Sequence, residues 1–225
     1  MHGRFSPAHQ EELALSRALA PRLERWFSVA GRDFPWREWR DEYRVLVTEV
    51  LLQRTRAGVV ATFLTRFLGR YPSWESIETS DRSELEAVLE PLGLQRRRAS
   101  NLASLASISP TDRRSDRAPG IGQYIGRAVR VNIDGVREAM VDSNFVRVLR
   151  RVFPGPWKAD YRYDTRLQEL AQAVIDGAKD PRAANWAVLD LGAFVCTPRR
   201  PRCRECPLAD LCPSSSTTQL AGGLA

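Results

Sequence analysis

The four cysteines are the residues of this chain whose spacing points most directly to chemistry. They all lie close to the C-terminal end with the spacing C-x6-C-x2-C-x5-C, at Cys196, Cys203, Cys206 and Cys212. Four thiolates on a short loop rich in proline suit a tetrahedral metal site, either four-cysteine zinc or an iron–sulfur cluster. The spacing by itself leaves both metals open.

Two carboxylates stand at positions that favour catalysis. Asp142 directly precedes a helical pattern of apolar residues, which predicts a helix-capping aspartate that the terminal amides and the helix dipole hold ionised. Glu49 is the one charge in the apolar run from Val45 to Leu52, and a buried carboxyl group there can protonate or hydrogen-bond a leaving group. The alternatives are a plain cap at Asp142 and, at Glu49, a structural carboxylate paired with an arginine.

A glycine-rich turn, Pro119-Gly120-Ile121-Gly122, lies upstream of Asp142 and opens another helical pattern. The glycines remove side chains from a site of close backbone approach. We predict that the amides of Gly120 and Gly122 bind a phosphate of nucleic acid, irrespective of its sequence. An ordinary tight turn between helices is the alternative interpretation.

Composition favours a polyanion as partner. The 225 residues include 34 lysines and arginines, nearly all arginine, and carry a formal net charge of +7; neutralising phosphates with such side chains releases counterions. With 43% hydrophobic residues and no apolar run of the ~20 residues that a transmembrane helix needs, we expect a globular protein. The N-terminus lacks the apolar centre of a signal peptide, so we expect a cytoplasmic protein associated with the nucleoid.

Helical periodicity of apolar residues predicts an all-α fold, because no stretch sustains the alternation of a strand. The predicted helices span residues 7–27, 43–53, 58–69, 83–89, 96–108, 165–178 and 181–194, with two more after Gly122 and Asp142. We predict a polar loop over residues 109–117 and a disordered tail over residues 214–225.

In this order, the PGIG turn, Asp142 about twenty residues later and the cysteine loop resemble the helix-hairpin-helix, Gly/Pro-Asp superfamily of DNA glycosylases with an iron–sulfur loop. This group contains endonuclease III and the MutY-type adenine glycosylases, and the resemblance covers about Phe34 to Cys212. It implies a [4Fe-4S] cluster held by the four cysteines, and two helical lobes with DNA in a cleft between them. We expect a six-helix barrel over residues 36–136 and a discontinuous cluster domain over residues 1–35 and 137–213.

Tyr124 distinguishes subgroups within this superfamily. Members that also cleave the strand carry a nucleophilic lysine two residues after the second glycine of the turn, where this chain has Tyr124. Adenine glycosylases usually have serine there, and thymine/uracil–G mismatch glycosylases have tyrosine. Residues 140–148 are also similar to the mismatch-thymine subgroup. Adenine glycosylases carry a further C-terminal domain that reads 8-oxoguanine, and we expect this chain to lack it.

The resemblance also implies roles for single residues. Asp142 would act on the sugar, Tyr124 would grip the flipped base, and Glu49 corresponds to the general acid of MutY-type enzymes. Two short loops would enter the duplex and probe the opposite base, namely Gln53-Arg54 and Leu94-Gln95. Arginine at position 54 suits an orphan guanine, whose O6 and N7 it can bind together. In the cysteine loop, we expect Arg199 and Arg200 to contact phosphates.

These observations predict a monomeric, monofunctional glycosylase that acts on double-stranded DNA containing a mismatch or a base lesion. The base removed is expected to be thymine or uracil opposite guanine. An adenine glycosylase, or a glycosylase for a modified pyrimidine, would use the same chemistry on another base. A non-catalytic DNA-binding module is the third interpretation, although such a module has no physical need of Asp142 and Glu49.

Overall fold

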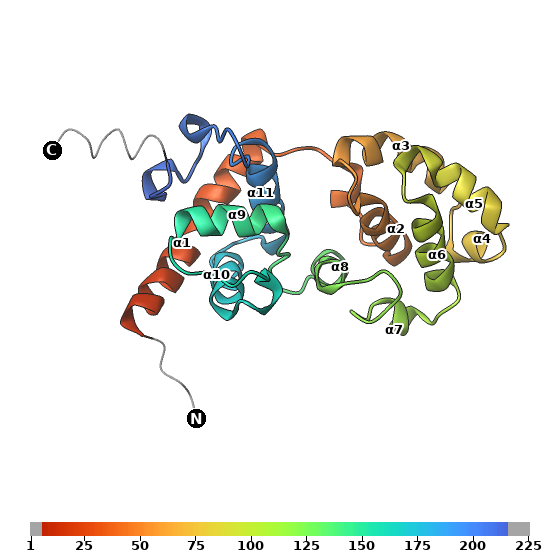
Figure 1. Ribbon diagram of the computed structural model, residues 1–225, viewed down its shortest axis with the longest axis horizontal. Coiled ribbons are helices and arrows are strands. Elements are labelled where there is room, and N and C mark those ends of the chain that lie inside the picture. The colour runs from red at the N-terminus through yellow and green to blue at the C-terminus, as the bar shows by residue number, and fades with distance from the viewer. Residues whose placement is uncertain (1–5, 216–225) are drawn as a thin grey trace, which may run out of the picture. The chain divides into compact units, whose positions relative to one another are not determined.

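The structure is a computed structural model that describes residues 6–215, so most of the tail predicted over residues 214–225 lies outside the described residues. All regular elements in this part of the chain are helices, which confirms the all-α prediction (Figure 1). Contacts divide the chain into two compact units. Unit 1 combines the residues up to Arg32 with those from Val136 onward, and unit 2 is Asp33–Gly135.

Unit 1 contains four long helices around one apolar core. They are α1 (Pro7–Ala30), α9 (Ser143–Val152), α10 (Thr165–Asp176) and α11 (Pro181–Phe194). Helix α1 packs against α10 and α11, and α11 packs against α9. The short 3-10 turns η4 (Tyr161–Tyr163), η5 (Cys203–Glu205) and η6 (Ala209–Leu211) lie in the connections. This packing joins the N-terminal helix to elements that are distant in the sequence.

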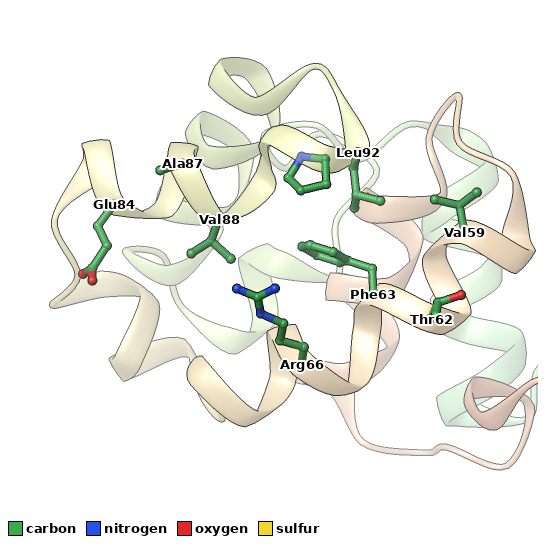
Figure 2. Close-up of a pocket in the computed structure, with 9 residues that line it drawn as sticks. Val59, Thr62, Phe63, Arg66, Glu84, Ala87, Val88 and Leu92 are labelled. Carbon is green, nitrogen blue, oxygen red and sulfur yellow. The ribbon is translucent and has the colours of Figure 1, made fainter.

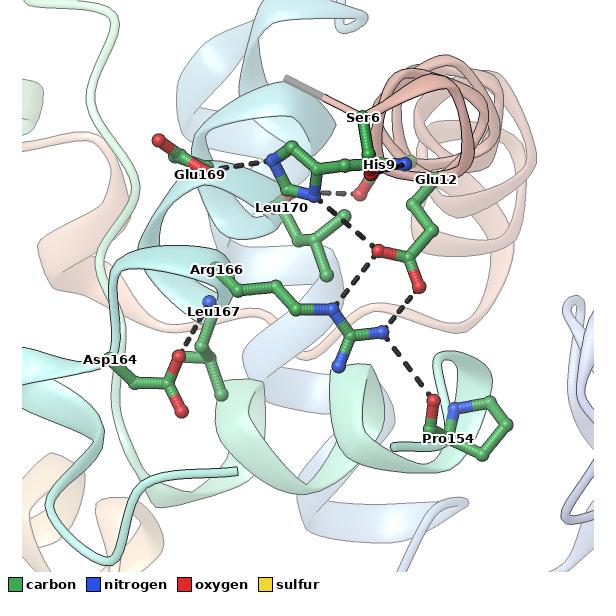
Figure 3. Close-up of polar contacts among 10 residues, drawn as sticks. Ser6, His9, Glu12, Pro154, Asp164, Arg166, Leu167, Glu169 and Leu170 are labelled. Carbon is green, nitrogen blue, oxygen red and sulfur yellow. Dashed lines mark hydrogen bonds and ion pairs between the residues drawn. The ribbon is translucent and has the colours of Figure 1, made fainter. Parts of the chain in front are cut away.

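Polar contacts also fasten the first turns of α1 to α10 (Figure 3). Glu12 accepts hydrogen bonds from Arg166, with Nε 3.0 Å from Oε2. His9 lies between two carboxylates, and its Nε2 is 2.8 Å from Oε2 of Glu169. The hydrogen bond from Arg166 holds the pKa of Glu12 below its usual value. The Glu12–Arg166 ion pair therefore stabilises the α1–α10 contact above acidic pH.

Unit 2 contains seven helices around a separate core. They are α2 (Glu42–Leu52), α3 (Ala57–Arg70), α4 (Trp74–Glu78), α5 (Arg82–Leu89), α6 (Gln95–Ala106), α7 (Pro110–Arg113) and α8 (Gln123–Val129). The 3-10 turns η1 (Pro35–Arg37) and η2 (Glu90–Leu92) precede α2 and α6, and a π-helical turn, η3 (Arg130–Asp134), continues α8. Helix α2 is the central element, because it packs against α3, α6 and α8. Its residues from Val45 to Leu51 are all buried.

The loop predicted over residues 109–117 is partly wrong, since it contains the single helical turn α7. Ser109 accepts a hydrogen bond from the backbone N–H of Asp112, and Pro110 occupies the first helical position. Proline is favoured there because that N–H has no helical partner. This turn forms because of its local capping. Apolar periodicity could not predict it, because four residues are too few to show a helical repeat.

Candidate functional site

Asp142 caps α9, as its position in the sequence predicts. Its Oδ1 accepts hydrogen bonds from the backbone N–H groups of Asn144 and Phe145, both at 2.8 Å. Its Oδ2 accepts a third, also at 2.8 Å, from the side-chain amide of Asn144. Three donors therefore fix the orientation of this half-buried carboxylate.

The surroundings of Asp142 shift its pKa in opposing directions. Burial raises the pKa of Asp142, and the hydrogen bonds from Phe145 and Asn144 oppose this shift without cancelling it. Removal of water penalises the carboxylate more than the cap favours it, so the pKa of Asp142 lies above its ordinary value. A raised pKa suits a group that accepts a proton from water during a reaction.

A chain of hydrogen bonds connects Asp142 with the cysteine loop. The Asn144 side chain that donates to Asp142 accepts from Nη2 of Arg147 through its Oδ1, at 2.6 Å. Arg147 also donates to the carbonyl oxygens of Gly192, at 2.6 Å, and Cys196, at 2.7 Å. The orientation of the carboxylate is therefore set through Asn144 and Arg147 by the segment that begins the cysteine loop.

Gly192 allows α11 to approach this chain of hydrogen bonds. A Cβ atom at this position would lie 2.5 Å from Cβ of Asn144 and 3.1 Å from its Cα. Glycine inside a helix weakens it relative to alanine, so close packing against Asn144 explains its presence. Any side chain here would push Asn144 away from Asp142.

The four cysteines line one small cavity in unit 1, together with Arg151, Val195, Pro201, Ala209, Ser214 and Ser215. Arg151 donates from Nη1 to Sγ of Cys196 at 3.1 Å. Sγ of Cys212 donates to the carbonyl oxygen of Arg151 at 3.3 Å. The last turn of α9 thus contacts the cavity from one side, while Asp142 caps the opposite end of the helix.

The donor set of this cavity, four cysteine sulfurs, suits a metal centre. Burial, with the charges of the other three cysteines, raises the pKa of Cys206 to about 11, so four adjacent thiolates require a cationic group among them. Zinc would require all four sulfurs about 2.3 Å from one point. A cluster distributes its thiolates over several irons.

Unit 2 carries the glycine-rich turn at the start of α8. Gly120 has a φ of +76°, and a Cβ atom there would lie 2.3 Å from Nδ2 of Asn101, so glycine is required on both counts. Around Gly122 a Cβ atom would meet nothing within 4 Å. Within residues 6–215 the backbone N–H groups of these two glycines have no hydrogen-bond acceptor. The turn is thus open for an anionic ligand to approach its backbone.

The other predicted residues of unit 2 lie on α2 and α8 and at the two loops. Glu49 is buried on α2, with 8% of its surface exposed. Tyr124 is half-buried in the first turn of α8 and packs against the unit 2 core. Arg54 follows α2 with an exposed side chain, and Leu94 precedes α6 with 44% of its surface exposed. Their neighbours Gln53 and Gln95 are half-buried.

Gln53 is used inside the unit. Its Nε2 donates to the carbonyl oxygen of Gly120 at 2.8 Å, which ties the end of α2 to the glycine-rich turn. In the cysteine loop, Arg199 and Arg200 are exposed, whereas Arg202 donates to the carbonyl oxygen of Phe194 at 3.0 Å. The structure thus leaves Arg199 and Arg200 accessible to a phosphate.

Unit 2 also has an open groove between α3 and α5 (Figure 2). It is lined by Val59, Thr62, Phe63, Arg66, Glu84, Ala87, Val88, Pro91 and Leu92. None of the predicted catalytic or DNA-binding residues contributes to it. The groove is therefore separate from the candidate site.

Comparison with known proteins identifies this arrangement. Residues 47–173 match the family described as "HhH-GPD superfamily base excision DNA repair protein", and residues 196–212 match the iron–sulfur binding domain of endonuclease III. The chain belongs to the HhH-GPD superfamily. The predicted family is thus confirmed, and so is an iron–sulfur cluster in place of zinc. The family description names base excision DNA repair, which identifies DNA as the partner.

Individual HhH-GPD proteins are similar over most of this chain. The thymine/uracil-DNA glycosylase of Methanothermobacter thermautotrophicus is 38% identical over 196 residues, which cover 83% of this chain and 88% of that protein. A solved structure of a thermostable thymine-DNA glycosylase superposes with a TM-score of 0.82 at 32% identity, covering 93% of this chain and 99% of that one. The adenine DNA glycosylase of Rattus norvegicus is 31% identical over 92% of this chain, but only 44% of that protein is covered.

Sequence reasoning missed three residues that hold the site together. Asn144 and Arg147 follow Asp142 in α9 but carry no pattern that reveals their hydrogen bonds. Arg98 is buried in α6, and a signal for it exists: it falls at helical spacing from Leu102 and Leu105, on the inward face. A charged residue at an inward position indicates a buried polar contact.

For residues 6–215, no helix is both long enough and apolar enough to span a membrane.

Proposed function

We propose that this protein is a monofunctional DNA glycosylase that removes thymine or uracil opposite guanine. The observation that carries the proposal is that the chain has both a capped, half-buried Asp142 and a tyrosine at position 124. The names of the relatives that this chain resembles over most of its length, thymine/uracil-DNA glycosylase and thymine-DNA glycosylase, support the choice of base.

Asp142 supplies the charge that the reaction requires. Cleavage of a glycosidic bond passes through a sugar with oxocarbenium character, which an adjacent carboxylate stabilises. The carboxylate also accepts a proton from the water that attacks C1′, while the bond between C1′ and the base breaks. Asn144 keeps the carboxylate oriented, because its side-chain amide donates to Oδ2.

Tyr124 and Glu49 act on the departing base in this proposal. The aromatic ring of Tyr124 offers a stacking surface for a flipped pyrimidine. Its side chain ends in a hydroxyl and has no amine, so it cannot form a Schiff base with the sugar. Glu49 provides a buried carboxyl group that hydrogen-bonds the base as it leaves. Since lysine is absent from position 124, the enzyme releases the base and leaves the DNA strand intact.

DNA with a mismatch is bound through sequence-independent and base-reading contacts. The amides of Gly120 and Gly122, with Arg199 and Arg200, hold phosphates. Gln53, Arg54, Leu94 and Gln95 belong to the loops that probe the opposite base. When bound, the [4Fe-4S] cluster supplies cationic irons that hold the four thiolates together. We further propose that the protein acts as a monomer, because one chain contains every named group.

A panel of duplexes tests this function. Purified protein is incubated with T·G, U·G, A·8-oxoguanine and modified-pyrimidine duplexes, and abasic sites are revealed as strand breaks after alkali. We expect breaks in T·G and U·G duplexes only after alkali. Release of adenine, which the rat relative's name makes the second candidate, would replace the substrate and keep the chemistry. Lesion binding without release of any base would favour the non-catalytic alternative.

A further inference from the structure

Arg98 on α6 is the largest fully buried side chain in unit 2, with 1% of its surface exposed. Its guanidinium pairs with no carboxylate among the described residues and instead donates to carbonyl and hydroxyl oxygens. Burial lowers the pKa of Arg98. A buried cation without a counter-charge is costly in a protein, so the groups that it holds are expected to matter for more than packing.

The five acceptors of Arg98 come from two separate loops. Nη1 donates to the carbonyl oxygens of Leu92, at 2.7 Å, and Gly93. Nη2 donates to three oxygens at the end of α2, namely the carbonyls of Leu51 at 3.1 Å and Gln53 at 2.6 Å and the hydroxyl of Thr55 at 2.5 Å. One guanidinium thus joins the loop after α2 to the loop before α6.

Each of these loops presents one side chain in an unusual backbone conformation. Among residues 6–215, Arg54 and Leu94 are the non-glycine residues with positive φ, at 57° and 50°. Arg54 lies between the acceptors Gln53 and Thr55, and Leu94 directly follows the acceptor Gly93. A residue with a Cβ adopts the left-handed conformation only where its surroundings impose it. The hydrogen bonds from Arg98 are placed to impose it at both positions.

Helix α6 extends this arrangement to the glycine-rich turn. Asn101, one turn after Arg98, occupies the space that a Cβ of Gly120 would fill. Gln53, whose carbonyl accepts from Arg98, donates through its side chain to the carbonyl of Gly120 at 2.8 Å. The two loops and the turn are therefore held as one group by contacts that radiate from α6.

We propose that Arg98 is a positioning residue that presets Arg54 and Leu94 for probing the duplex and thereby sets selectivity for the base opposite the excised one. The inference rests on the proposed function, in which these loops meet that base. A guanidinium distinguishes guanine by binding O6 and N7 together, which demands a fixed approach. A loop already in its bound conformation pays less ordering entropy on binding.

Arg98→Lys is the direct test, because lysine keeps the charge but cannot fork to five acceptors in two loops. Arg113→Lys is the matched control. Arg113 donates to the carbonyls of Leu105 and Ala106 at the other end of α6, away from both loops. The two variants therefore make the same substitution at arginines that contact opposite ends of α6. They differ in the carbonyl groups that the arginine binds, which lie in the two loops for Arg98 and at the end of α6 for Arg113.

The first readout is amide hydrogen exchange of the DNA-free proteins, which requires no activity. We expect exchange over residues 53–56 and 93–96 to accelerate by about tenfold or more in Arg98→Lys and to stay unchanged in Arg113→Lys. Equal protection of these segments in both variants would overturn the proposal.

The second readout is single-turnover base release at saturating enzyme from duplexes with G, A or C opposite the excised base. We expect the preference for opposite guanine to fall about tenfold in Arg98→Lys, with a smaller change in the rate on the guanine duplex. A rate loss of equal size on all three duplexes, following the loss of Tm as in Arg113→Lys, would show a purely structural role and overturn the proposal.

Thr55→Val covers the case in which Arg98→Lys does not fold. It removes one side-chain acceptor and leaves the backbone carbonyls, so we expect a shift in selectivity in the same direction, about two- to threefold. Unchanged selectivity in a folded Thr55→Val protein, together with unchanged exchange over residues 53–56, would refute the inference. A wild-type protein that releases neither thymine nor uracil would instead refute the proposed function, and the exchange comparison would still decide the role of Arg98.

Discussion

Unit 1 and unit 2 each hold a candidate functional group through one arginine that donates to backbone carbonyls. In unit 1, Arg147 connects Asn144, and through it Asp142, to the backbone of Gly192 and Cys196. In unit 2, Arg98 connects two loops that carry the exposed side chains Arg54 and Leu94. The arginine of unit 1 orients a carboxylate, whereas that of unit 2 fixes backbone conformations.

This difference separates two kinds of defect. Loosening a carboxylate that acts in the transition state lowers the rate of reaction and leaves binding largely intact. Loosening loops that read a base lowers discrimination between substrates. Changes around Asp142 in unit 1 should therefore lower the rate, and changes around Arg98 in unit 2 should lower the selectivity.

Asp142→Asn should have the largest effect. Asparagine keeps an acceptor for the amides of Asn144 and Phe145 but removes the charge, so we expect base release to fall about a thousandfold or more with duplex affinity retained. Single-turnover kinetics and gel-shift binding measure the two. Asp180→Asn is the matched control, because Asp180 caps α11 in the same way. It accepts hydrogen bonds from the backbone N–H groups two and three residues onward, those of Arg182 and Ala183. Loss of binding, or equal rate losses in both variants, would contradict the role of Asp142.

Arg147→Lys should lower the rate at saturating enzyme by about tenfold, because lysine cannot bind Asn144, Gly192 and Cys196 together. Preference for the opposite base should stay unchanged, in contrast with Arg98→Lys. Arg150→Lys serves as control on the same helix, since Arg150 donates to the carbonyl of Lys158 away from Asp142. If Arg147→Lys changed selectivity and not rate, the separation of tasks between the units would be wrong.

The rate should also depend on pH more strongly than binding does. Burial raises the pKa of Asp142, so the reactive carboxylate is lost at a higher pH than for an ordinary aspartate. As the pH falls below this raised value, the single-turnover rate should drop by up to about tenfold per unit. Affinity for the mismatched duplex, measured over the same range, should change little. A rate that stays level down to the ordinary range of aspartate would contradict the raised pKa.

Glu12→Gln should have the smallest effect and touch neither task. Since Arg166 holds the pKa of Glu12 down, the stabilisation is present above the usual range of glutamate and is lost as the pH falls through the lowered pKa. We expect a loss of less than about 1 kcal/mol, or a few degrees in Tm, at neutral pH. The difference in Tm from the wild type should vanish in acid. A change in base release at neutral pH would show that this contact influences the site.

Local patterns predicted the elements that carry the site more fully than the contacts that support it. Apolar periodicity and the capping position of Asp142 are properties of a few adjacent residues, and the structure has both. The hydrogen bonds from Arg147 to Cys196 and from Arg98 to Leu51 join residues more than forty positions apart. No spacing within one helix specifies such contacts, because they depend on how helices pack. The balance between burial, which raises the pKa of Asp142, and the capping hydrogen bonds, which lower it, likewise depends on how the helices pack.

The most direct test of the account is the duplex panel with wild-type protein and Asp142→Asn side by side. We expect wild-type protein to produce alkali-labile sites in T·G and U·G duplexes, Asp142→Asn to produce none on the same timescale, and both proteins to bind these duplexes. Wild-type protein that leaves T·G and U·G duplexes uncut after alkali, or that cuts them as fast as Asp142→Asn does, would contradict it.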